Sequence, residues 1–478
     1  MVRVLVVGAG ISGLACAFDL ARGGQDVTVL EAGSEVGGVV GSVQVDGFHF
    51  ENGPNTVQST ARHFRGLAGD LGIADRLIVS RSEAKVRFVY HRGRLVPLPR
   101  GPFSFLFSPL LSVAAKWHIL TEGFRDYEHV RDDDIEPNFE TFLRGRIGAE
   151  ATRRLAGAFV RGVYAAEIDQ LGARSAFPRL WSLVNDSGGL LRGVRTAFRT
   201  MRREVLPGPQ TMRGDLLSFS SGLGELPRCI ARELGDRMRT GVRVTAIARQ
   251  GSGWSVTTDG GENLAAERVI LAVSAPVAHS LLAPLVGNGP GSLHVASLTG
   301  IDHAAVTLVH LGLRRSAAAA GSGPVLPPGF GFLVPPDESH EAPQWGVPSA
   351  LGTLFVSNLF SGRAPEGDAA VTSFYRTEDV VNEDEHTLRA RALRDLMLAT
   401  GQRNAAEVVA SRIQRWENVI PRYGVGHARI VDDLCATVAS ALPGLALAGN
   451  YTGGVSVDDC IARGRAVAED ILAQETTR

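Results

Sequence analysis

The N-terminal part of the chain reads Val2-Arg3-Val4-Leu5-Val6-Val7, followed by Gly8-Ala9-Gly10-Ile11-Ser12-Gly13. The apolar run is typical of a strand buried in a parallel sheet, and the residues from Ile11 to about Arg22 have the pattern of a helix. The three glycines therefore lie in the turn between a strand and a helix. The first permits a tight turn, the second lets a phosphate approach the backbone, and the third lets helix and strand pack closely.

A second predicted strand, Asp26-Val27-Thr28-Val29-Leu30, ends at Glu31, 18 residues after Gly13. An acidic residue at this place binds the ribose hydroxyls of a dinucleotide and disfavours a 2′-phosphate. The alternative, an ordinary corner between a strand and a helix, needs neither the acid nor its spacing. The combination predicts a dinucleotide site with the pyrophosphate at the positive end of a helix.

A second glycine-rich stretch indicates which dinucleotide is bound. Gly37, Gly38 and Gly41 come shortly after Glu31, and a turn at Gly53-Pro54-Asn55 follows. A nicotinamide enzyme has no need of this stretch. An FAD enzyme does, because its chain must pass beneath the rest of the pyrophosphate and reach the isoalloxazine. The stretch therefore predicts FAD.

Near the C-terminus, the strand-like Leu445-Ala446-Leu447-Ala448 leads into Gly449-Asn450-Tyr451-Thr452-Gly453-Gly454-Val455, and a helix is predicted from about Val457 to Leu472. The start of that helix is a second site for negative charge. Aimed at the N1–C2 carbonyl edge of a flavin, its amides would stabilise the charge that develops when the flavin accepts a hydride. The alternative is a further glycine corner without a ligand.

The pattern of predicted elements divides the chain into three domains. We expect residues 1–80, 213–284 and 416–478 to form a discontinuous FAD-binding domain, residues 81–94 and 285–415 a substrate-binding domain, and residues 95–212 a helical domain. Strands are predicted at Val242–Ile247, Arg268–Val273, Ala305–His310 and Gly352–Val356, helices at Phe139–Arg146, Glu150–Val163 and Glu385–Thr400, a helix cap near Asp134, and a loop over Ala317–Gly323.

Composition and charge exclude several classes of protein. The 478 residues carry 49 Lys+Arg against 50 Asp+Glu, so no overall field would hold nucleic acid or an anionic membrane. The four cysteines form no C-x-x-C pair, which favours a reducing compartment. No spacing of Cys, His or acidic residues predicts a metal site, and no uninterrupted apolar run is long enough to span a bilayer.

Several motifs together resemble the protoporphyrinogen oxidase family, almost from end to end of the chain. The N-terminal part is similar to the wider family of amine oxidases and carotenoid desaturases, and the later motifs are narrower. Besides Gly8–Gly13, Glu31 and Gly53-Pro54-Asn55, the resemblance rests on Arg161-Gly162-Val163-Tyr164-Ala165, Ala176-Phe177-Pro178, Gly329-Phe330-Gly331-Phe332-Leu333-Val334-Pro335 and Asp458-Asp459-Cys460-Ile461.

The resemblance implies a fold and an activity. The fold is α/β: an FAD-binding Rossmann-like domain of the p-hydroxybenzoate-hydroxylase type, a mixed α+β substrate domain and a helical, membrane-associating domain. The activity is the oxidation of protoporphyrinogen IX to protoporphyrin IX in heme biosynthesis, by successive hydride transfers to flavin N5, with O2 as acceptor and H2O2 as product. No catalytic side chain and no metal are implied, because the pyrrole nitrogens stabilise the cation that hydride loss creates.

Three alternatives stay open. A coproporphyrinogen III oxidase would need more cations along the slot for its extra propionates. A flavin amine oxidase would usually have an aromatic cage and a residue linked to the flavin, for which Cys460 is the one cysteine near a plausible flavin segment. A flavin-binding protein without turnover is the third.

The resemblance also implies particular site residues. Arg87 would bind a substrate propionate, with His91 and Arg92 as close substitutes, and apolar side chains would enclose the tetrapyrrole. The substrate-binding set is Arg87, Leu333, Leu354, Phe374, Ala166 and Phe330, and the FAD-binding set is Gly8, Gly10, Ile11, Ser12, Gly13, Glu31, Ala32, Gly37, Gly38, Gly53, Pro54, Asn55, Val244, Gly449, Asn450, Val455 and Val457.

The chain departs from the family pattern near the implied pocket. Tyr164-Ala165-Ala166 stands where the family usually has Tyr-Ala-Gly, and Tyr375-Arg376 stands where it has a glycine pair. The residue before Tyr423 is Arg422, where a glutamine is common. The added bulk puts the identity of the substrate in doubt and keeps the alternative without turnover open.

The most apolar stretch of the helical domain is Gly101–Val113, which contains Phe105 and Phe107. It is too short to span a bilayer, so it either lies in the membrane surface or is a buried loop. We expect a tetrapyrrole substrate and O2 as partners, with no nucleic acid. We further expect a cytoplasmic protein that can lie peripherally on the inner face of the cell membrane, with a homodimer left open.

Overall fold

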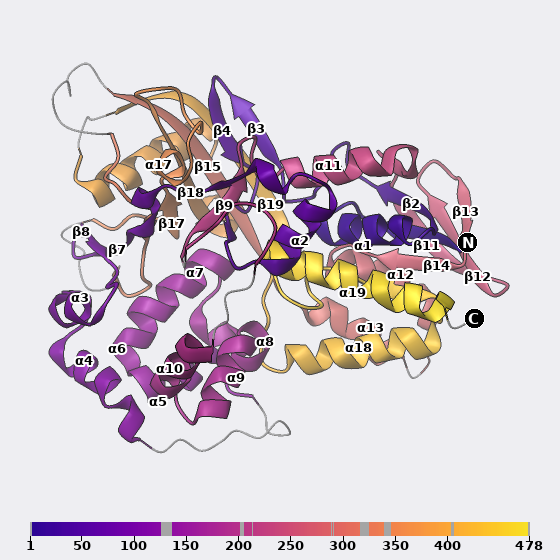
Figure 1. The fold of residues 1–478 in the computed structure, drawn as a ribbon, viewed down its shortest axis with the longest axis horizontal. Helices are drawn as coiled ribbons and strands as arrows, with labels where there is room; N and C mark the ends of the chain where they lie inside the picture. Colours follow the sequence, from indigo (N-terminus) through magenta and orange to yellow (C-terminus); the bar gives the residue numbers. More distant parts are fainter. Residues whose placement is uncertain are drawn as a thin grey trace.

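The computed structural model describes residues 2–125, 136–200, 205–212, 214–287, 289, 291–315, 325–338, 346–402 and 406–476. Figure 1 shows two main sheets and a group of helices. A parallel sheet lies at the end of the molecule that carries both termini. A larger sheet and the helical lobe lie at the opposite end.

The parallel sheet has five strands in the order β10-β2-β1-β14-β20. Every neighbouring pair is parallel, and the apolar side chains of the central strands are buried on both faces, as the continuous apolar runs predict. The strands are β1 (Arg3–Val7), β2 (Asp26–Glu31), β10 (Met238–Thr240), β14 (Arg268–Leu271) and β20 (Leu445–Leu447).

The strand predicted over Val242–Ile247 is present from Val244 onward, but it does not belong to the parallel sheet. The edge strand of the parallel sheet is β10, a few residues earlier, and the chain then turns at Gly241, which has a positive φ. The next strand, β11 (Val244–Gln250), forms an antiparallel sheet with β12 (Gly253–Thr258) and β13 (Asn263–Ala266). Alternation of apolar and polar residues does not show which sheet a strand joins, because its apolar face would be buried in the parallel and in the antiparallel sheet alike.

Different elements cover the two faces of the parallel sheet. One face packs against α1 (Ile11–Arg22), α2 (Arg62–Asp70), α11 (Glu225–Leu234) and α19 (Val457–Thr476). The other packs against the antiparallel sheet, α12 (Ala275–Val286), α13 (Ser292–Ala296) and α18 (His427–Ala441). The sheet is therefore the middle layer of three.

The larger sheet has seven strands in the order β19-β15-β18-β17-β16-β7-β8, and all of its pairs except β16 with β7 are antiparallel. The predicted strand at Ala305–His310 and the predicted helix at Glu385–Thr400 are confirmed, whereas the strand predicted over Gly352–Val356 ends at Leu354 and a short helix begins at Val356. The strands are β7 (Arg87–His91), β8 (Arg94–Pro97), β15 (His303–Arg315), β16 (Gly331–Leu333), β17 (Gly352–Leu354), β18 (Ala369–Arg376) and β19 (Ala406–Pro421), and α17 (Glu385–Thr400) packs on one face.

The helical lobe follows β8. Its helices are α3 (Pro102–Phe107), α4 (Val113–Leu120), α5 (Phe139–Ile147), α6 (Ala149–Ala151), a π-helical segment (Thr152–Gly157), α7 (Ala158–Tyr164), α8 (Ala173–Ala176), α9 (Pro178–Ser187) and α10 (Leu190–Thr200). The two helices predicted here are confirmed. The predicted cap at Asp134 and the predicted loop over Ala317–Gly323 lie outside the described residues, and the side chain of Asn138 caps α5.

Short strands connect these parts. The hairpin of β3 (Ser42–Val45) and β4 (Phe48–Glu51) extends from the parallel sheet toward the larger sheet, and a small sheet joins β5 (Val57–Gln58), β9 (Leu216–Phe219) and β6 (Leu77–Val79). Two further short helices are α15 (Val356–Leu359) and α16 (Thr377–Val380). Within the described ranges, no helix has both the length and the apolar character that crossing a bilayer requires.

Candidate functional site

The glycines after β1 form a cradle at the start of α1. Gly8 has a φ of +99°, and a Cβ there would lie 2.5 Å from the carbonyl oxygen of Ala272. A Cβ on Gly13 would lie 2.1 Å from the Gly8 oxygen, so strand and helix touch. A Cβ on Gly10, in contrast, would meet no atom within 4 Å. Gly10 caps α1 without a side chain, so the N–H groups of the first turn face open space.

Glu31 lies against this cradle at the end of β2. One carboxylate oxygen accepts a hydrogen bond from the Ala9 N–H and the other from the Gly33 N–H, each over 2.7 Å. The Val242 N–H donates to the Glu31 carbonyl, which brings the buried Val244 of β11 close to the same edge. Ala32 is exposed. The predicted cofactor-binding residues Glu31, Ala32 and Val244 thus lie close together.

The second glycine-rich stretch passes directly beside the first. The Gly37 N–H donates to the Ala9 carbonyl over 2.8 Å, and a Cβ on Gly38 would lie 3.5 Å from the Gly10 Cα. Farther along, a Cβ on Gly53 would lie 2.6 Å from the Val39 carbonyl oxygen. Only glycine therefore lets the turn before Pro54 approach this stretch.

The C-terminal motif reaches the same edge from the other side. Because β1 and β20 belong to one parallel sheet, the loops that follow them, which hold Gly10 and Gly449, lie at the same edge of that sheet. The helices that follow, α1 and α19, run side by side in Figure 1, and a Cβ on Gly464 would lie 2.1 Å from the Ser12 carbonyl oxygen. Two helix N-termini therefore converge there.

The residues at this edge fit a dinucleotide that carries a flavin. The space at Gly10 and the two helix N-termini suit negative groups. The side-chain oxygens Oδ1 of Asn52 and Asn55 are buried and have no hydrogen-bond partner in the described part of the chain. Such acceptors are rare unless a ligand or water satisfies them. Ile11, Ser12, Pro54, Asn450, Val455 and Val457, which the sequence also predicts, all belong to these segments.

One strand of the larger sheet, β19, is bonded to two loops at this edge of the parallel sheet: the loop before Gly53 and the loop after β20. We call them the cofactor loops. The sequence analysis did not predict these bonds. The Trp416 Nε1–H of β19 donates to the Asn52 carbonyl over 2.6 Å, and the Val419 carbonyl accepts from Asn450 Nδ2 over 2.9 Å. Beyond the strand, the Tyr423 hydroxyl donates to the Asn450 carbonyl and accepts from the Gly454 N–H. Burial raises the pKa of Tyr423, so this hydroxyl keeps its proton.

The predicted substrate-binding side chains share one face of the larger sheet. Arg87 is in register with Gly331 and Gly331 with Leu354, while Leu333 is opposite Gly352 and Gly352 opposite Phe374. Paired residues project to the same side of a sheet, as do residues two apart. Arg87, Leu333, Leu354 and Phe374 therefore form one surface, and glycines separate them. We call it the substrate face.

The substrate face extends to the cofactor loops and is partly covered by the helical lobe. Trp416 projects to the same side of the sheet. Phe374 and Gln414 are both in register with Leu308 and so share its side, and Trp416 lies two residues after Gln414. Ala165, at the end of α7, packs in one cluster with Phe374 and Trp416. A Cβ on Gly162 of α7 would lie 2.4 Å from Leu333 Cδ2. The face thus lies between the cofactor edge and α7.

At the outer end of the face, Arg87 lies over the ring of Phe330, with its guanidinium carbon 5.1 Å from the ring centroid. Partial burial, and after it the charge of Arg100, lowers the pKa of Arg87. Two positive charges are therefore close together. His91 is no substitute, because it is buried and its Nδ1 is 2.6 Å from Glu338. Arg92 is exposed in the turn after β7.

The residues that depart from the family pattern have defined partners. Tyr375 projects to the opposite face of the sheet, where its hydroxyl donates to Asp395 over 3.1 Å. Arg376 donates to Glu167 of the helical lobe. Ala166 is fully buried in the cluster of the helical lobe that also contains Tyr164 and Tyr423. Ala166 is therefore not exposed on the substrate face, whereas Leu333, Leu354 and Phe374 are part of it.

A buried ion pair beneath the cofactor loop was also missed. Glu51, just before Asn52, accepts from the Ser42 hydroxyl and the Leu223 N–H, and it lies 3.5 Å from Arg363. Burial raises its pKa to about 7, while Arg363 opposes the rise. The only hint in the sequence is an acidic residue at the end of the short strand Phe48-His49-Phe50-Glu51. In the part of the chain that the structure describes, no His, Cys, Asp or Glu side chains gather as metal ligands would.

Comparisons with known proteins agree with this geometry. The family described as flavin containing amine oxidoreductase matches residues 11–472. Among curated proteins, the chain is 28% identical to the chloroplastic protoporphyrinogen oxidase of Nicotiana tabacum, over 98% of this chain and 85% of that one. It is 26% identical to the coproporphyrinogen III oxidase of Bacillus subtilis, over 98% of each chain.

Among solved structures, the fold is similar to one from Exiguobacterium sp. 255-15 that is provisionally assigned as a protoporphyrinogen oxidase. The TM-score is 0.80, with 24% identity over 99% of each chain. The likeness supports the mixed α/β fold with its parallel sheet.

We expect the substitution Trp416→Phe to loosen the cofactor loop. It leaves the Asn52 carbonyl without its donor, which costs about 1–3 kcal/mol when the group is buried. The free energy of unfolding, measured by urea denaturation, should fall by about that amount, and bound flavin should dissociate faster. Trp117→Phe is the matched control, because the Trp117 side chain is 68% exposed. Equal effects of the two substitutions would contradict the role of Trp416.

Proposed function

The chain belongs to the family of flavin containing amine oxidoreductases, and we propose that this oxidoreductase uses FAD to convert protoporphyrinogen IX to protoporphyrin IX. The observation that carries the proposal is the substrate face. It offers leucine and phenylalanine side chains next to the cofactor loops and a pair of cations at its outer end. A flat tetrapyrrole with carboxylates along one edge has the matching shape and charge.

When bound, FAD supplies the two-electron acceptor that oxidation of a carbon centre requires. The chain contributes binding and orientation. The amides at Gly10 and at the start of α19 would hold negative groups of the cofactor, and Glu31 the ribose hydroxyls. The apolar residues of the substrate face would exclude water, and Arg87 would fix the substrate at its edge. The three-layered arrangement of the parallel sheet supports an FAD domain of the p-hydroxybenzoate-hydroxylase type.

The distribution of charge favours protoporphyrinogen over coproporphyrinogen. No carboxylate in the described residues pairs with Arg87 or Arg100, so one end of the face has an excess of positive charge. At the other end, Arg161 and Arg376 share Glu167, with Asp379 nearby, and their charges are largely balanced. Protoporphyrinogen has propionates along one edge only, whereas coproporphyrinogen carries them all round.

The amine oxidase alternative has less support. Cys460, the candidate for a covalent link to a flavin, is buried, and its pKa is raised to about 11 by burial. A thiol with so high a pKa is a poor nucleophile at neutral pH. The curated relatives named above are porphyrinogen oxidases rather than amine oxidases.

The test is anaerobic mixing of the FAD-loaded protein with reduced porphyrinogens. Protoporphyrinogen IX should bleach the flavin absorbance, and porphyrin fluorescence should appear after O2 is admitted. Coproporphyrinogen III should react more slowly, and a primary amine should leave the flavin oxidised. Faster bleaching by coproporphyrinogen would assign the chain to that substrate, and no bleaching by either would overturn the proposed activity.

We expect Arg87→Ala to raise the KM for protoporphyrinogen about tenfold while kcat changes little. A contact with a propionate is equally strong in the ground state and the transition state, and its loss appears in KM. Arg92→Ala, in the exposed turn after the same strand, is the control and should leave KM unchanged. A drop in kcat at constant KM would instead mean that Arg87 acts on the reacting part of the substrate.

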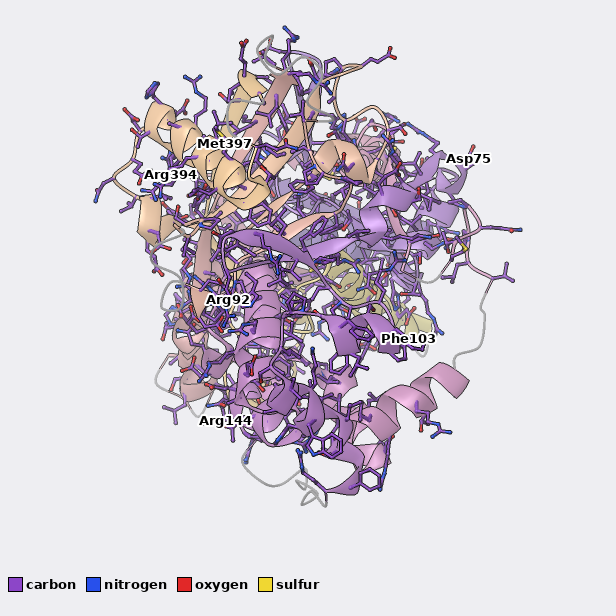
Figure 2. The ribbon with its side chains drawn as sticks, turned by 90° about the vertical axis from the view of Figure 1, so that its left-hand side faces the viewer. Asp75, Arg92, Phe103, Arg144, Arg394 and Met397 are labelled. Atoms are coloured by element: carbon purple, nitrogen blue, oxygen red, sulfur yellow. The ribbon has the colours of Figure 1, made fainter. Side chains whose placement is uncertain are left out.

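We further propose that the helical lobe lies on a membrane surface. Phe103, Phe107 and Phe124 are 82%, 78% and 91% exposed, which is unusual for large apolar side chains. Leu106, Val113, Trp117 and Leu120 are exposed beside them in sequence, on α3 and α4. We call these seven residues the apolar patch. Figure 2 labels Phe103 on the side of the molecule remote from the termini.

The structure distinguishes two phenylalanines that the sequence treats alike. Phe105 packs against a buried cluster that includes Leu110 and Leu111, so it belongs to the lobe's interior. Phe107 is exposed. The apolar side that α3 would place in a membrane interface is therefore formed by Phe103 and Phe107, not by Phe105.

Replacing Phe103 and Phe107 with serine should reduce co-sedimentation with liposomes, because each ring contributes about 1.5–3 kcal/mol when it leaves water. Flavin content and Tm should remain nearly unchanged. The control Phe105→Ser should lower Tm, since it introduces a hydroxyl into a packed cluster. Co-sedimentation that is unaffected by the double substitution would contradict membrane binding through this patch.

A further inference from the structure

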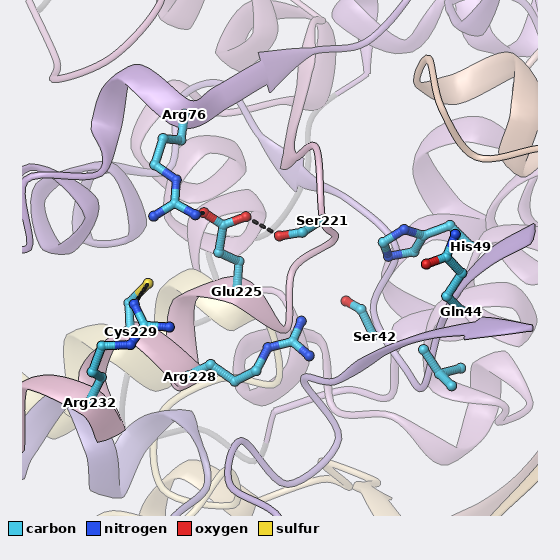
Figure 3. A pocket seen from close by; sticks show the side chains of 10 residues that line it. Ser42, Gln44, His49, Arg76, Ser221, Glu225, Arg228, Cys229 and Arg232 are labelled. Atoms are coloured by element: carbon cyan, nitrogen blue, oxygen red, sulfur yellow. Dashed lines mark hydrogen bonds and ion pairs between the residues drawn. The ribbon is translucent and has the colours of Figure 1, made fainter. Parts of the chain in front are cut away.

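A cavity of about 320 Å³ lies on the outer side of α11, between that helix and the β3–β4 hairpin. Figure 3 shows its lining from close by. Arginines reach it from α11 and from the residues before β6, and polar side chains reach it from the hairpin. Its volume is within the range of small-molecule sites.

The charge of the cavity wall is unbalanced. Arg76 is neutralised by Glu225, at 2.5 Å, and Glu225 also accepts from the Ser221 hydroxyl. Arg228 and Arg232 form no ion pair with a carboxylate in the described part of the chain, although the charge of Arg228 also acts on the buried Glu51. They are four residues apart on one face of α11, so their guanidinium groups project to the same side. Two positive charges therefore remain.

The opposite wall provides an unused hydrogen-bonding group. His49 Nε2 is buried and has no partner among the described residues. Burial, followed by the charge of Arg363, lowers the pKa of His49 to about 4; a hydrogen bond with the Ser221 backbone opposes the shift, and Arg228 adds a smaller lowering effect. The imidazole is thus neutral at neutral pH. Gln44 and Ser42 line the cavity beside it, and Val43 contributes an apolar surface.

The cavity is separate from the cofactor edge. The inner side of α11 presents Pro227 to the glycine stretch, where a Cβ on Gly37 would lie 2.8 Å from the proline ring. Leu226 and Ile230 are buried in the core beneath the parallel sheet. The cavity residues Arg228 and Arg232 lie on the outer side of the same helix. The helix therefore stands between the two sites.

We propose that this cavity binds a phosphate monoester of a small polar molecule. A phosphate dianion matches the two unbalanced charges, and guanidinium groups bind its oxygens in a bidentate manner. A monocarboxylate would leave one charge uncompensated. The remaining volume, next to Gln44, His49 and Val43, accommodates a polar organic group. The inference does not depend on which porphyrinogen the chain oxidises.

The test is isothermal titration calorimetry of the FAD-loaded protein at constant ionic strength. Holoprotein is used because the glycine cradle at Gly10 would otherwise also bind phosphate. Ribose 5-phosphate should bind with a stoichiometry of one, and more tightly than succinate. Inorganic phosphate that binds as tightly as the ester would support a phosphate site but overturn the organic part of the assignment.

Variants of the exposed arginines locate the site without disturbing the fold. Arg228→Gln and Arg232→Gln should each weaken ribose 5-phosphate binding at least about tenfold, as expected for loss of a charge-assisted contact. The affinity of the Arg228→Lys variant for ribose 5-phosphate should lie between those of the unchanged protein and of Arg228→Gln, because lysine keeps the charge but not the bidentate geometry. Arg429→Gln, an exposed arginine of α18, is the control. Absence of binding, or equal affinity in all variants at unchanged Tm, would overturn the proposal.

Discussion

The hydrogen bonds of β19 determine how the substrate face meets the cofactor edge. Trp416 bonds to the loop before Gly53, and the end of the strand bonds to the loop after β20. Both loops are rich in glycine, and such segments move more readily than strands. β19 is paired along most of its length with β15. Since displacements of about 1 Å can lower a rate a hundredfold, this anchoring matters for catalysis.

The parts of the fold that the sequence predicts correctly are local. The turn at Gly8–Gly13, the acid at Glu31 and the helix at Glu385–Thr400 each depend on neighbouring residues, whose spacing fixes a strand, a turn or a helix. The local sequence predicts only part of the arrangement of α1 and α19. The glycines at their starts predict two anion sites, but the contact between Gly464 and Ser12 joins residues that are hundreds of positions apart.

The parts that could not be predicted depend on which distant residues meet. Trp416 and Arg363 are ordinary members of their own segments, and nothing in those segments indicates the Asn52 carbonyl or Glu51 as their partner. The same limit applies to the strand expected at Val242–Ile247, because alternation shows that a strand exists but not which sheet it joins. Phe105 and Phe107 differ only in the direction in which a short helix turns them.

Tyr375 and Arg376 show how two large side chains can follow Phe374 on β18 without covering the substrate face, because successive side chains of a strand project to opposite sides. A glycine pair adds nothing to either side of a sheet, whereas Tyr375 and Arg376 project to opposite sides. Tyr375 therefore fills space under α17, where burial raises both its own pKa and that of Asp395, so that their hydrogen bond replaces two solvated groups. Arg376 remains on the side of Phe374, but its guanidinium is bonded to Glu167. The pair Tyr375-Arg376 thus ties the sheet to the helical lobe at the end of the substrate face remote from Arg87. The surface between Leu354 and Phe374 is formed by Gly331 and Gly352, which are in register with them.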